Sequence, residues 1–216
     1  MPGPQLAADW PQQARMRLQQ GLADMALALP EAQIDSLMAY LEALVKWNNA
    51  FNLTAIREPL AMVDKHLLDS LSIQPHIGPD SLIDIGTGAG LPGVILAIVN
   101  TQLAVTVLDS NSKKTRFITQ FKAAHGLDNL TVITARCEQH HGQYAQICSR
   151  AFASLHDMVA GTEHLLAPDG RWLAMKGHIP HDELAELAST ITLENAPALR
   201  VPFAAQARHL ICLARQ

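Results

Sequence analysis

A ten-residue stretch between two apolar segments, Asp84 to Gly93, constrains the fold more than any other part of the chain. It reads Asp-Ile-Gly-Thr-Gly-Ala-Gly-Leu-Pro-Gly, with the apolar run 82–85 leading into it and the apolar run 91–99 leaving it. This pattern predicts a strand, a tight glycine turn and a helix start, because glycine tolerates positive φ and lets a ligand approach the backbone. A helix N-terminus offers unpaired N–H groups. The stretch therefore predicts a site for part of a nucleotide-like cofactor.

The glycine spacing separates the candidate cofactors. In the dinucleotide fingerprint G-x-G-x-x-G, counted from Gly86, the third glycine would fall on Leu91, and the stretch has no Gly-Lys-Ser/Thr end of a P-loop. An acid, Asp84, stands two residues before the first glycine. A carboxylate there suits a cofactor that carries an ammonium group and would repel a pyrophosphate. The spacing favours S-adenosylmethionine, with a dinucleotide site and a purely structural turn as the alternatives.

Composition places the chain among ordinary globular proteins. Its 216 residues suffice for one α/β domain with an extension. No apolar run reaches the length of a membrane span, and the first residues lack the basic start and apolar core of a signal peptide. The three cysteines are odd in number and far apart, which favours reduced thiols and a cytoplasmic protein. Because the net charge is −4, any contact with nucleic acid must rest on a local basic patch.

Helical periodicity fills the first third of the chain. Apolar residues recur at helical spacing over about 10–29, most regularly from residue 34 until the pattern ends at Trp47-Asn48-Asn49, and again from Pro59 to about 71. Proline and glycine cluster just before residue 79. We therefore predict a helical extension over 1–78 and a cofactor-binding domain over 79–216.

Beyond that boundary, strand and helix patterns alternate. This alternation predicts an α/β fold with a doubly wound, mostly parallel sheet of seven strands. A Pro-Asp-Gly turn is expected at 168–170, and Asn111 or Ser112 is expected to cap the helix that follows the second strand. The expected strands are 81–85, 104–108, 130–134, 145–150 and 171–176, followed by two near 191–201 and 208–214 that form an antiparallel hairpin at one edge.

Residues at the carboxyl ends of the strands are the first candidates for ligand contacts, because open parallel sheets bind ligands there. Asp109 ends the second strand and is placed to accept both ribose hydroxyls, although a helix cap would also explain an acid there. Cys137 and Glu138 end the third strand, where an adenine would lie, with an exposed surface acid as the alternative for Glu138. Arg150 ends the fourth strand and would hold a substrate phosphate or a cofactor carboxylate, unless it is simply solvated.

Several sequence features reduce the range of possible substrates. The fourth strand does not end in Asn/Asp-Pro-Pro-Tyr/Phe, and the chain has no Pro-Cys nucleophile, which argues against methylation of exocyclic amines and of pyrimidine C5. The paired histidines at 140–141 and at 178 and 181 lack spaced cysteines or acids, so we expect no metal site. A basic cluster at 113–116 opens one helix near the expected active face; it is either a solvated face or a phosphate contact.

Motifs along nearly the whole chain make it resemble one family. They are Trp47-Asn48, Asn52-Leu53-Thr54, His66 with Asp69-Ser70, Leu91-Pro92-Gly93, Leu108-Asp109-Ser110, Lys113-Lys114, Ser149-Arg150-Ala151, Lys176-Gly177 and Arg208-His209. Together they are similar to the RsmG family, formerly called glucose-inhibited division protein B, which comprises bacterial small-subunit ribosomal RNA methyltransferases that modify guanine N7. Where the family commonly has Arg-Ala-Glu or Arg-Val-Glu, this chain has Arg136-Cys137-Glu138.

The resemblance implies a Rossmann-like, class I S-adenosylmethionine-dependent methyltransferase that acts on one guanine N7 of 16S ribosomal RNA, as RNA or as a small-subunit particle. Guanine N7 carries an in-plane lone pair and loses no proton, so we expect no catalytic base, only positioning and electrostatics. The alternatives are a methyltransferase of the same fold that acts on a small molecule or a protein, and a cofactor-binding module without catalysis. We expect a cytoplasmic monomer without membrane contact or bound metal.

Two sets of site residues follow from the patterns and the resemblance together. The expected cofactor contacts are Asp84, Gly86, Gly88, Gly90, Leu91, Asp109, Cys137, Glu138 and Arg150. The candidates for contact with RNA phosphates or with the guanine edge are Asn48, Asn52, Arg57, His66, Lys113, Lys114, Arg116, Lys176 and Arg208. For His66, an interior histidine with satisfied hydrogen bonds is the alternative.

Overall fold

Seven strands lie side by side in the order β3-β2-β1-β4-β5-β8-β6, and the short β7 pairs with β8 beside this path. The computed structural model describes residues 9–150, 152 and 154–216, so Ala151 of the Ser-Arg-Ala motif lies outside the described residues. The strands are β1 (Leu82–Ile85), β2 (Val105–Asp109), β3 (Leu130–Thr134), β4 (Tyr144–Ser149), β5 (Leu166–Lys176), β6 (Ile191–Asn195), β7 (Ala198–Leu199) and β8 (Arg208–Arg215).

Strand direction follows the predicted pattern. β1 pairs in parallel with β2 and β4, and the outer pairs β2–β3 and β4–β5 are also parallel. β8 runs antiparallel to both of its long neighbours, β5 and β6. β1 and β2 are buried along their whole length, as expected of parallel strands that helices cover on both faces. The structure confirms a doubly wound, mostly parallel sheet with an antiparallel edge.

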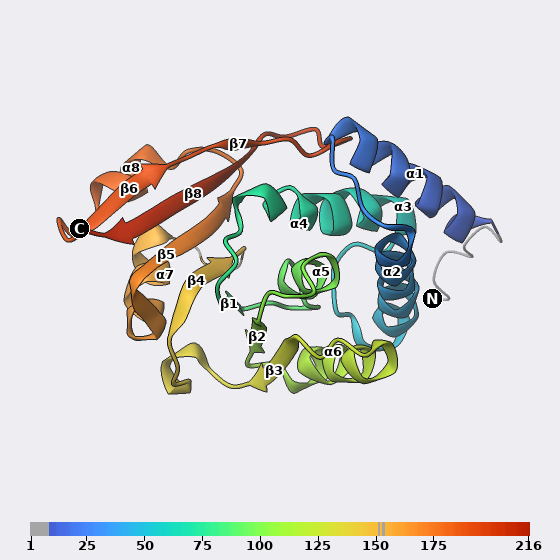
Figure 1. Cartoon of the computed structure of the whole chain (residues 1–216), viewed down its shortest axis with the longest axis horizontal. Coiled ribbons are helices and arrows are strands. Elements are labelled where there is room, and N and C mark those ends of the chain that lie inside the picture. Colours follow the sequence, from blue (N-terminus) through green and yellow to red (C-terminus); the bar gives the residue numbers. More distant parts are fainter. Residues whose placement is uncertain (1–8, 151, 153) are drawn as a thin grey trace.

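Alternate residues of the strands enter two hydrophobic clusters on opposite faces of the sheet. Leu82 and Val107 join the first cluster, with residues of α2 (Glu31–Phe51), α5 (Gly93–Val99) and α6 (Ser112–His125). Ile83 and Leu108 join the second, with residues of α7 (Leu155–Thr162). In Figure 1, α7 and α8 (His181–Ala185) lie on one side of the sheet, and α2, α4 (Asp69–Leu71), α5 and α6 lie on the other.

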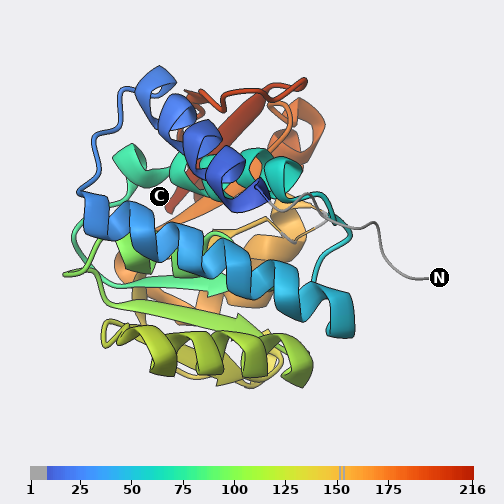
Figure 2. The ribbon, with the colours of Figure 1, turned by 90° about the vertical axis from the view of Figure 1, so that its right-hand side faces the viewer.

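The helices before β1 pack on the first face of the sheet (Figure 2). Leu18 and Leu41 are fully buried in the same cluster as Leu82, so the extension and the sheet share one core. The division at residues 78/79 stays a prediction. The helices are α1 (Trp10–Asp24), α2 (Glu31–Phe51), α3 (Pro59–Met62), a π-helical turn (Val63–Leu68) and α4 (Asp69–Leu71), and a short 3-10 turn (Gln74–His76) precedes β1.

Several predicted element boundaries differ in the structure. α2 continues past the predicted end to Phe51 and stops where Asn52 takes a left-handed conformation, with φ at 51°. Asn48 is buried inside the helix rather than ending it, because its polar side chain serves the next loop. The predicted turn at 168–170 lies within β5, whose register with β4 shifts between Tyr144 and Gln146. α6 begins with the predicted cap, in which the Asn111 side chain accepts from the Lys113 N–H.

Candidate functional site

The glycine turn after β1 lies against the end of β2. Gly86 and Gly88 have φ values of 67° and 62°, in the left-handed region that favours glycine. The Gly86 N–H donates to the Leu108 carbonyl at 2.8 Å, and the Gly88 N–H donates to the Asp109 carboxylate at 2.9 Å. A Cβ on Gly88 would meet only the Lys114 ammonium within 4 Å, at 3.9 Å. The turn is therefore open on the side where a ligand would lie.

The other end of the turn faces the protein interior. Gly90 has φ at 101°, and a Cβ there would be 2.4 Å from Val94, so packing against the helix requires this glycine. α5 begins at Gly93, two residues later than the helix pattern predicts, and its first N–H donates to the Asp84 carboxylate at 2.8 Å. That N–H is therefore not free for a ligand. Neither Gly90 nor Asp84 lines the cavities described below.

Asp84 holds the turn together from beneath. Its Oδ2 also accepts from the Thr87 hydroxyl at 2.6 Å, and its Oδ1 has no hydrogen-bond partner within the described part of the chain. Burial raises the pKa of Asp84 to about 6, although both hydrogen bonds oppose that change. A contact between Asp84 and a cofactor stays a prediction; the structure gives this carboxylate a place in shaping the turn.

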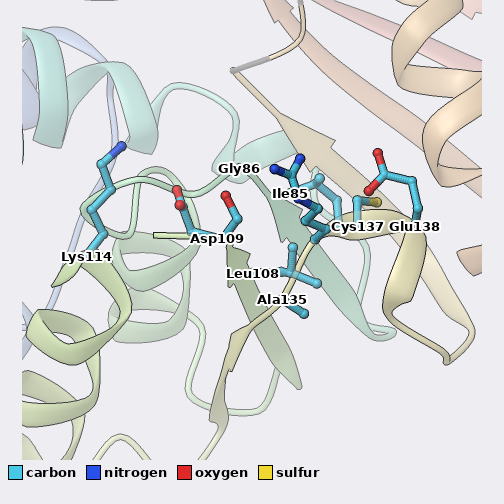
Figure 3. A pocket seen from close by; sticks show the side chains of 10 residues that line it. Ile85, Gly86, Leu108, Asp109, Lys114, Ala135, Cys137 and Glu138 are labelled. Carbon is cyan, nitrogen blue, oxygen red and sulfur yellow. The ribbon is translucent and has the colours of Figure 1, made fainter. Parts of the chain in front are cut away.

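The first cavity, of about 330 Å³, opens where β1, β2 and β3 end. Its apolar lining comes from Ile85, Leu108 and Ala135, and it carries carboxylates at Asp109 and Glu138. In Figure 3, Asp109 and Lys114 lie to one side of it, and Cys137 and Glu138 lie to the other. An apolar slot with an acid at either end suits a flat base joined to a hydroxylated sugar. The full lining is Ile85, Gly86, Leu108, Asp109, Ser110, Lys114, Ala135, Arg136, Cys137 and Glu138.

In the first cavity, hydrogen bonds fix the orientation of Asp109, and burial determines the protonation of Cys137. Asp109 accepts from the Asn111 N–H at 2.8 Å as well as from the glycine turn, so its carboxylate is fixed. Burial, with a smaller effect of the Glu138 charge, raises the pKa of Cys137 to about 11. The Cys137 thiol donates to the Gly161 carbonyl at 3.3 Å. Cys137 is therefore a protonated thiol at neutral pH and not a nucleophile.

The second cavity, of about 200 Å³, shares Gly86 with the first and lies on the other side of the turn. Arg150 from the end of β4 reaches it, and the helical extension supplies the facing wall. Its lining is Leu53, Thr54, His66, Gly86, Thr87, Gly88, Ala89, Leu91 and Arg150. The two cavities thus adjoin at Gly86 of the glycine turn, and we call them together the track.

A chain of hydrogen bonds holds the wall that the extension supplies. His66 Nδ1 lies 3.0 Å from the Lys65 carbonyl, which only accepts, so Nδ1 carries the proton. Nε2 then accepts from the Thr54 hydroxyl at 2.9 Å. Burial, reinforced by the positive charge of Arg150, lowers the pKa of His66 to about 4. His66 is therefore a neutral histidine with both nitrogens bonded, as in the alternative that the sequence leaves open, and it also lines the second cavity.

Asn48 supports the same wall from behind. Its amide nitrogen donates to the Ile56 carbonyl at 3.0 Å, and its amide oxygen accepts from the Thr54 N–H at 2.9 Å. The side chain is buried, so the structure places Asn48 behind the cavity wall. Asn52 and Arg57, by contrast, are exposed on this loop and bond to each other through their side chains.

The basic candidates fall into separate groups. Lys113 and Arg116 are exposed at the start of α6, and Lys114 turns toward the glycine turn. Lys176, at the end of β5, donates to Glu183 at 3.1 Å. Arg208 begins β8 and donates to Asp69 at 3.1 Å, and Asp69 in turn accepts from Arg150 at 2.6 Å. The structure thus brings Arg150 and Arg208 together through an acid, and leaves the α6 cations on the other side of the turn.

Other kinds of site find no support among the described residues. No group of three or more histidines, cysteines and acids is placed to hold a metal ion in residues 9–150, 152 and 154–216. Within the same residues, no helix has the length and apolar character needed to cross a membrane. The three cysteines are all free thiols, as predicted.

A protein-family model described as rRNA small subunit methyltransferase G, GidB, matches residues 33–211. The chain belongs to this family. A relative from Marinobacter nauticus named ribosomal RNA small subunit methyltransferase G is 48% identical over 208 residues, covering 95% of each chain. A relative of the same name from Pseudomonas syringae pv. tomato is 47% identical over 207 residues, covering 95% of this chain and 98% of its own. The family predicted from the motifs is therefore confirmed, and with it the expectation of a methyltransferase.

Solved structures confirm the fold class. A ribosomal protein L11 methylase from Lactobacillus delbrueckii subsp. bulgaricus superimposes with a TM-score of 0.52 at 17% identity, covering 69% of this chain and 77% of its own. A coclaurine N-methyltransferase, solved with N-methylheliamine and SAH, gives a TM-score of 0.53 at 15% identity, covering 88% and 74%. At such low identity, these matches establish the Rossmann-like methyltransferase fold and nothing finer.

The sequence motifs contained residues whose part in the site only the structure shows. Thr54 and Asp69 stand in two of the motifs that carry the resemblance, yet neither was assigned a contact. Leu53 and Ala89 line the second cavity without any chemical signal in the sequence. For Asp69, the sequence shows only an acid within an apolar helical pattern, and the structure shows that this acid is buried.

Proposed function

We propose that this chain transfers a methyl group from S-adenosyl-L-methionine to N7 of a guanine in 16S ribosomal RNA. The observation that carries the proposal is the family match over residues 33–211, with relatives named for the small-subunit RNA methyltransferase over almost their whole length. The two adjoining cavities at the strand ends support it, because a ligand with a base, a ribose and an amino-acid tail needs more than one lined space.

The donor set of the track fits this cofactor. Asp109 would accept the ribose hydroxyls, the apolar Ile85 and Leu108 would contact the adenine, and Glu138 would accept from its amino group. Arg150 would bind the carboxylate of the amino-acid tail in the second cavity. Gly86 and Gly88 keep the backbone between the two cavities free of side chains. When bound, S-adenosylmethionine supplies an electrophilic methyl group on a sulfonium.

We call the second cavity the transfer end of the track, because the methyl group would be transferred there. Its residues position the substrate rather than move protons. Guanine N7 presents a lone pair in the plane of the ring and has no proton to lose. Among the described residues of the second cavity, His66 is neutral, with one nitrogen donating and the other accepting a hydrogen bond. Cys137 in the first cavity holds its proton. Rate enhancement then comes from orientation and from the fixed charges around the site.

Contacts with RNA are assigned to the exposed and partly exposed cations around the track. Lys113, Lys114 and Arg116 would bind phosphates on one side, and Arg57 with Asn52 would do so near the loop of the extension. Lys176 and Arg208 would serve the edge formed by β5 and β8. The same proposal includes residues 1–78 as a helical extension, a monomer in the cytoplasm, and 16S RNA or a small-subunit particle as the partner.

The experiment supplies purified protein with methyl-labelled S-adenosylmethionine. Separate reactions contain deproteinised 16S RNA, small-subunit particles that lack the modification, and a mixture of ribosomal proteins. Label is expected in the RNA of one or both RNA-containing samples. Label only in protein would replace the proposal with the protein-methyltransferase alternative, and cofactor binding without transfer to any sample would favour a binding module.

A further inference from the structure

We propose that Asp69 is a positioning residue that fixes the guanidinium groups of Arg150 and Arg208 at the transfer end of the cofactor track. This proposal rests on the proposed function, which assigns the cavity that Arg150 lines to S-adenosylmethionine. Asp69 itself lines neither of the two cavities of the track. Its effect on the site would therefore act through the arginines.

Asp69 stands where three parts of the chain meet. It opens α4 directly after the π-helical turn, and its side chain is only 7% exposed. Arg150 follows the last residue of β4, and Arg208 is the first residue of β8. Because β8 is antiparallel to β5, its first residue lies at the same edge of the sheet as the carboxyl ends of β4 and β5. The helical extension thus supplies one acid to two arginines of the sheet.

The hydrogen bonds divide the carboxylate between the two arginines. Oδ2 accepts from Arg150 Nη1 at 2.6 Å, and Oδ1 accepts from Arg208 Nε at 3.1 Å. A carboxylate whose two oxygens are bound by different partners has little freedom to rotate. Because the trio carries two positive charges and one negative charge, removing the acid would leave two guanidinium groups facing each other in a poorly solvated place.

The bonding leaves Arg150 oriented toward the second cavity. The same Nη1 atom also donates to the Lys65 carbonyl at 3.3 Å, so both anchors hold one corner of the guanidinium. Its other N–H groups make no hydrogen bond with the described residues, and Arg150 lines the second cavity. Asp69 thus fixes the guanidinium at one side and leaves its remaining donors available for an anion.

On the opposite side of the acid, Arg208 faces a separate space. It lines a third cavity of about 320 Å³, together with Asp69 and Lys65. Asp69 and its two arginines therefore form the partition between this third cavity and the transfer end of the track. Since the position of Arg150 depends on the same carboxylate as that of Arg208, a change at Asp69 reaches both sides.

The test replaces Asp69 by asparagine, which keeps the shape and removes the charge. Calorimetry is expected to show S-adenosylmethionine binding about tenfold more weakly to Asp69→Asn, since a charge-assisted anchor of Arg150 is lost. The loss is expected to be absent when Arg150 is already alanine: Asp69→Asn/Arg150→Ala should bind like Arg150→Ala alone. A residue acting only through Arg150 gives such non-additivity, whereas a general structural role does not.

Asp64→Asn is the matched control. Asp64 lies in the π-helical turn, and its carboxylate accepts from Arg17 at 2.6 and 2.7 Å, so this variant also removes a carboxylate–arginine pair. Its cofactor affinity is expected to equal that of the wild type. Asp69→Glu, which keeps the charge but moves it by one methylene, covers the case in which the asparagine variant does not fold. It should bind the cofactor severalfold more weakly at an unchanged melting temperature.

Two results would overturn the proposal. One is wild-type cofactor affinity in Asp69→Asn, or in Asp69→Glu where the asparagine variant does not fold. The other is an equal further loss from Asp69→Asn in the Arg150→Ala background. Binding is measured without RNA, so a failure of RNA methylation alone would count against the proposed function and not against Asp69. A wild-type chain that binds no S-adenosylmethionine would overturn both.

Discussion

The two cavities of the track are built in different ways. The first is formed by residues 85–86, 108–110, 114 and 135–138, which lie at or after the ends of three neighbouring strands. The second combines the glycine turn with Leu53, Thr54 and His66 of the extension and with Arg150 from the fourth strand. The first cavity is thus formed by residues next to the strand ends, and the second by packing between segments that are far apart in the chain.

The two cavities also have different roles in the proposed methyl transfer. The first cavity is built from the strands β1, β2 and β3 of the sheet and from the residues that follow them. The second cavity is lined in part by Leu53, Thr54 and His66 of the extension, whose buried core is continuous with that of the sheet. We infer that the first cavity provides affinity for the nucleoside part of the cofactor and that the second determines where the methyl acceptor stands.

The strongest contrast concerns two buried titratable groups, Asp84 in the turn and His66 in the extension. The pKa of Asp84 is raised from 3.8 to about 6, so its contribution to stability is full below pH 4 and is lost as the pH rises through 6. The pKa of His66 is lowered from 6.5 to about 4, so its contribution is full above pH 6.5 and is lost as the pH falls through 4. Each is expected to change the free energy of unfolding by about 3 kcal/mol.

The two contributions therefore oppose each other between pH 4 and 6. Asp84→Asn should make stability rise more steeply with pH than in the wild type, and His66→Gln should make it rise less steeply or fall. Denaturant unfolding at several pH values from 4 to 7 measures both slopes. Curves for both variants that run parallel to the wild-type curve would show that neither group is perturbed by burial.

For the first cavity, Asp109→Ala tests the affinity for the nucleoside part of the cofactor. The variant is expected to bind S-adenosylmethionine about 100-fold more weakly, because it loses two charge-assisted hydrogen bonds to the ribose and the anchor of the Gly88 N–H. Calorimetry gives the dissociation constant, and the melting temperature shows whether the turn survives. A folded variant with wild-type affinity would contradict the assignment of the ribose to Asp109.

For the second cavity, Thr54→Val removes one hydroxyl at nearly constant volume. The hydroxyl bonds to His66, and it accepts from the Ile56 N–H at 3.2 Å, so the wall should loosen. The rate of methyl transfer is expected to fall about tenfold, with cofactor affinity changed much less. Thr131→Val, at an exposed position of β3, is the control. A loss confined to cofactor affinity would reverse the roles given to the two cavities.

Outside both cavities, Lys113→Ala/Arg116→Ala tests the RNA contacts of α6. Each phosphate contact that is lost should reduce the slope of log affinity against log salt by about 0.7–0.9, so RNA binding should weaken and become less sensitive to salt. Cofactor affinity should not change, since neither residue lines the track. Lys46→Ala, at an exposed position of α2, is the control. An unchanged salt slope would remove these two residues from the RNA contacts.

The contrast between the ends also explains what could be predicted from the sequence. Strand–helix alternation is a local signal, so the parallel sheet, the glycine turn and the nearness of Asp109 to Gly88 all followed from it. Asp84 shows the limit of that signal. Its flanking residues Ile83 and Ile85 face the second cluster, so strand alternation directs Asp84 to the opposite face, beneath α5.

Local sequence patterns could not predict contacts between residues that are far apart in the chain. The Asp69–Arg208 bond joins residues 139 apart in the chain, and the Arg150–Asp69 bond joins residues 81 apart. The bond between Thr54 and His66 depends on the loop after α2 and on a π-helical turn, which hydrophobic periodicity does not reveal. Family motifs included these residues, but only the packed structure shows what they contact.

The proposed activity is methylation of guanine N7 of 16S ribosomal RNA without a catalytic base. The most direct measurement is to digest RNA that the protein has methylated with labelled S-adenosylmethionine and to identify the labelled nucleoside and its position by mass spectrometry. We expect a single labelled species, 7-methylguanosine, at one position of the 16S RNA. Label at another atom or base, or label spread over many guanines, would contradict it.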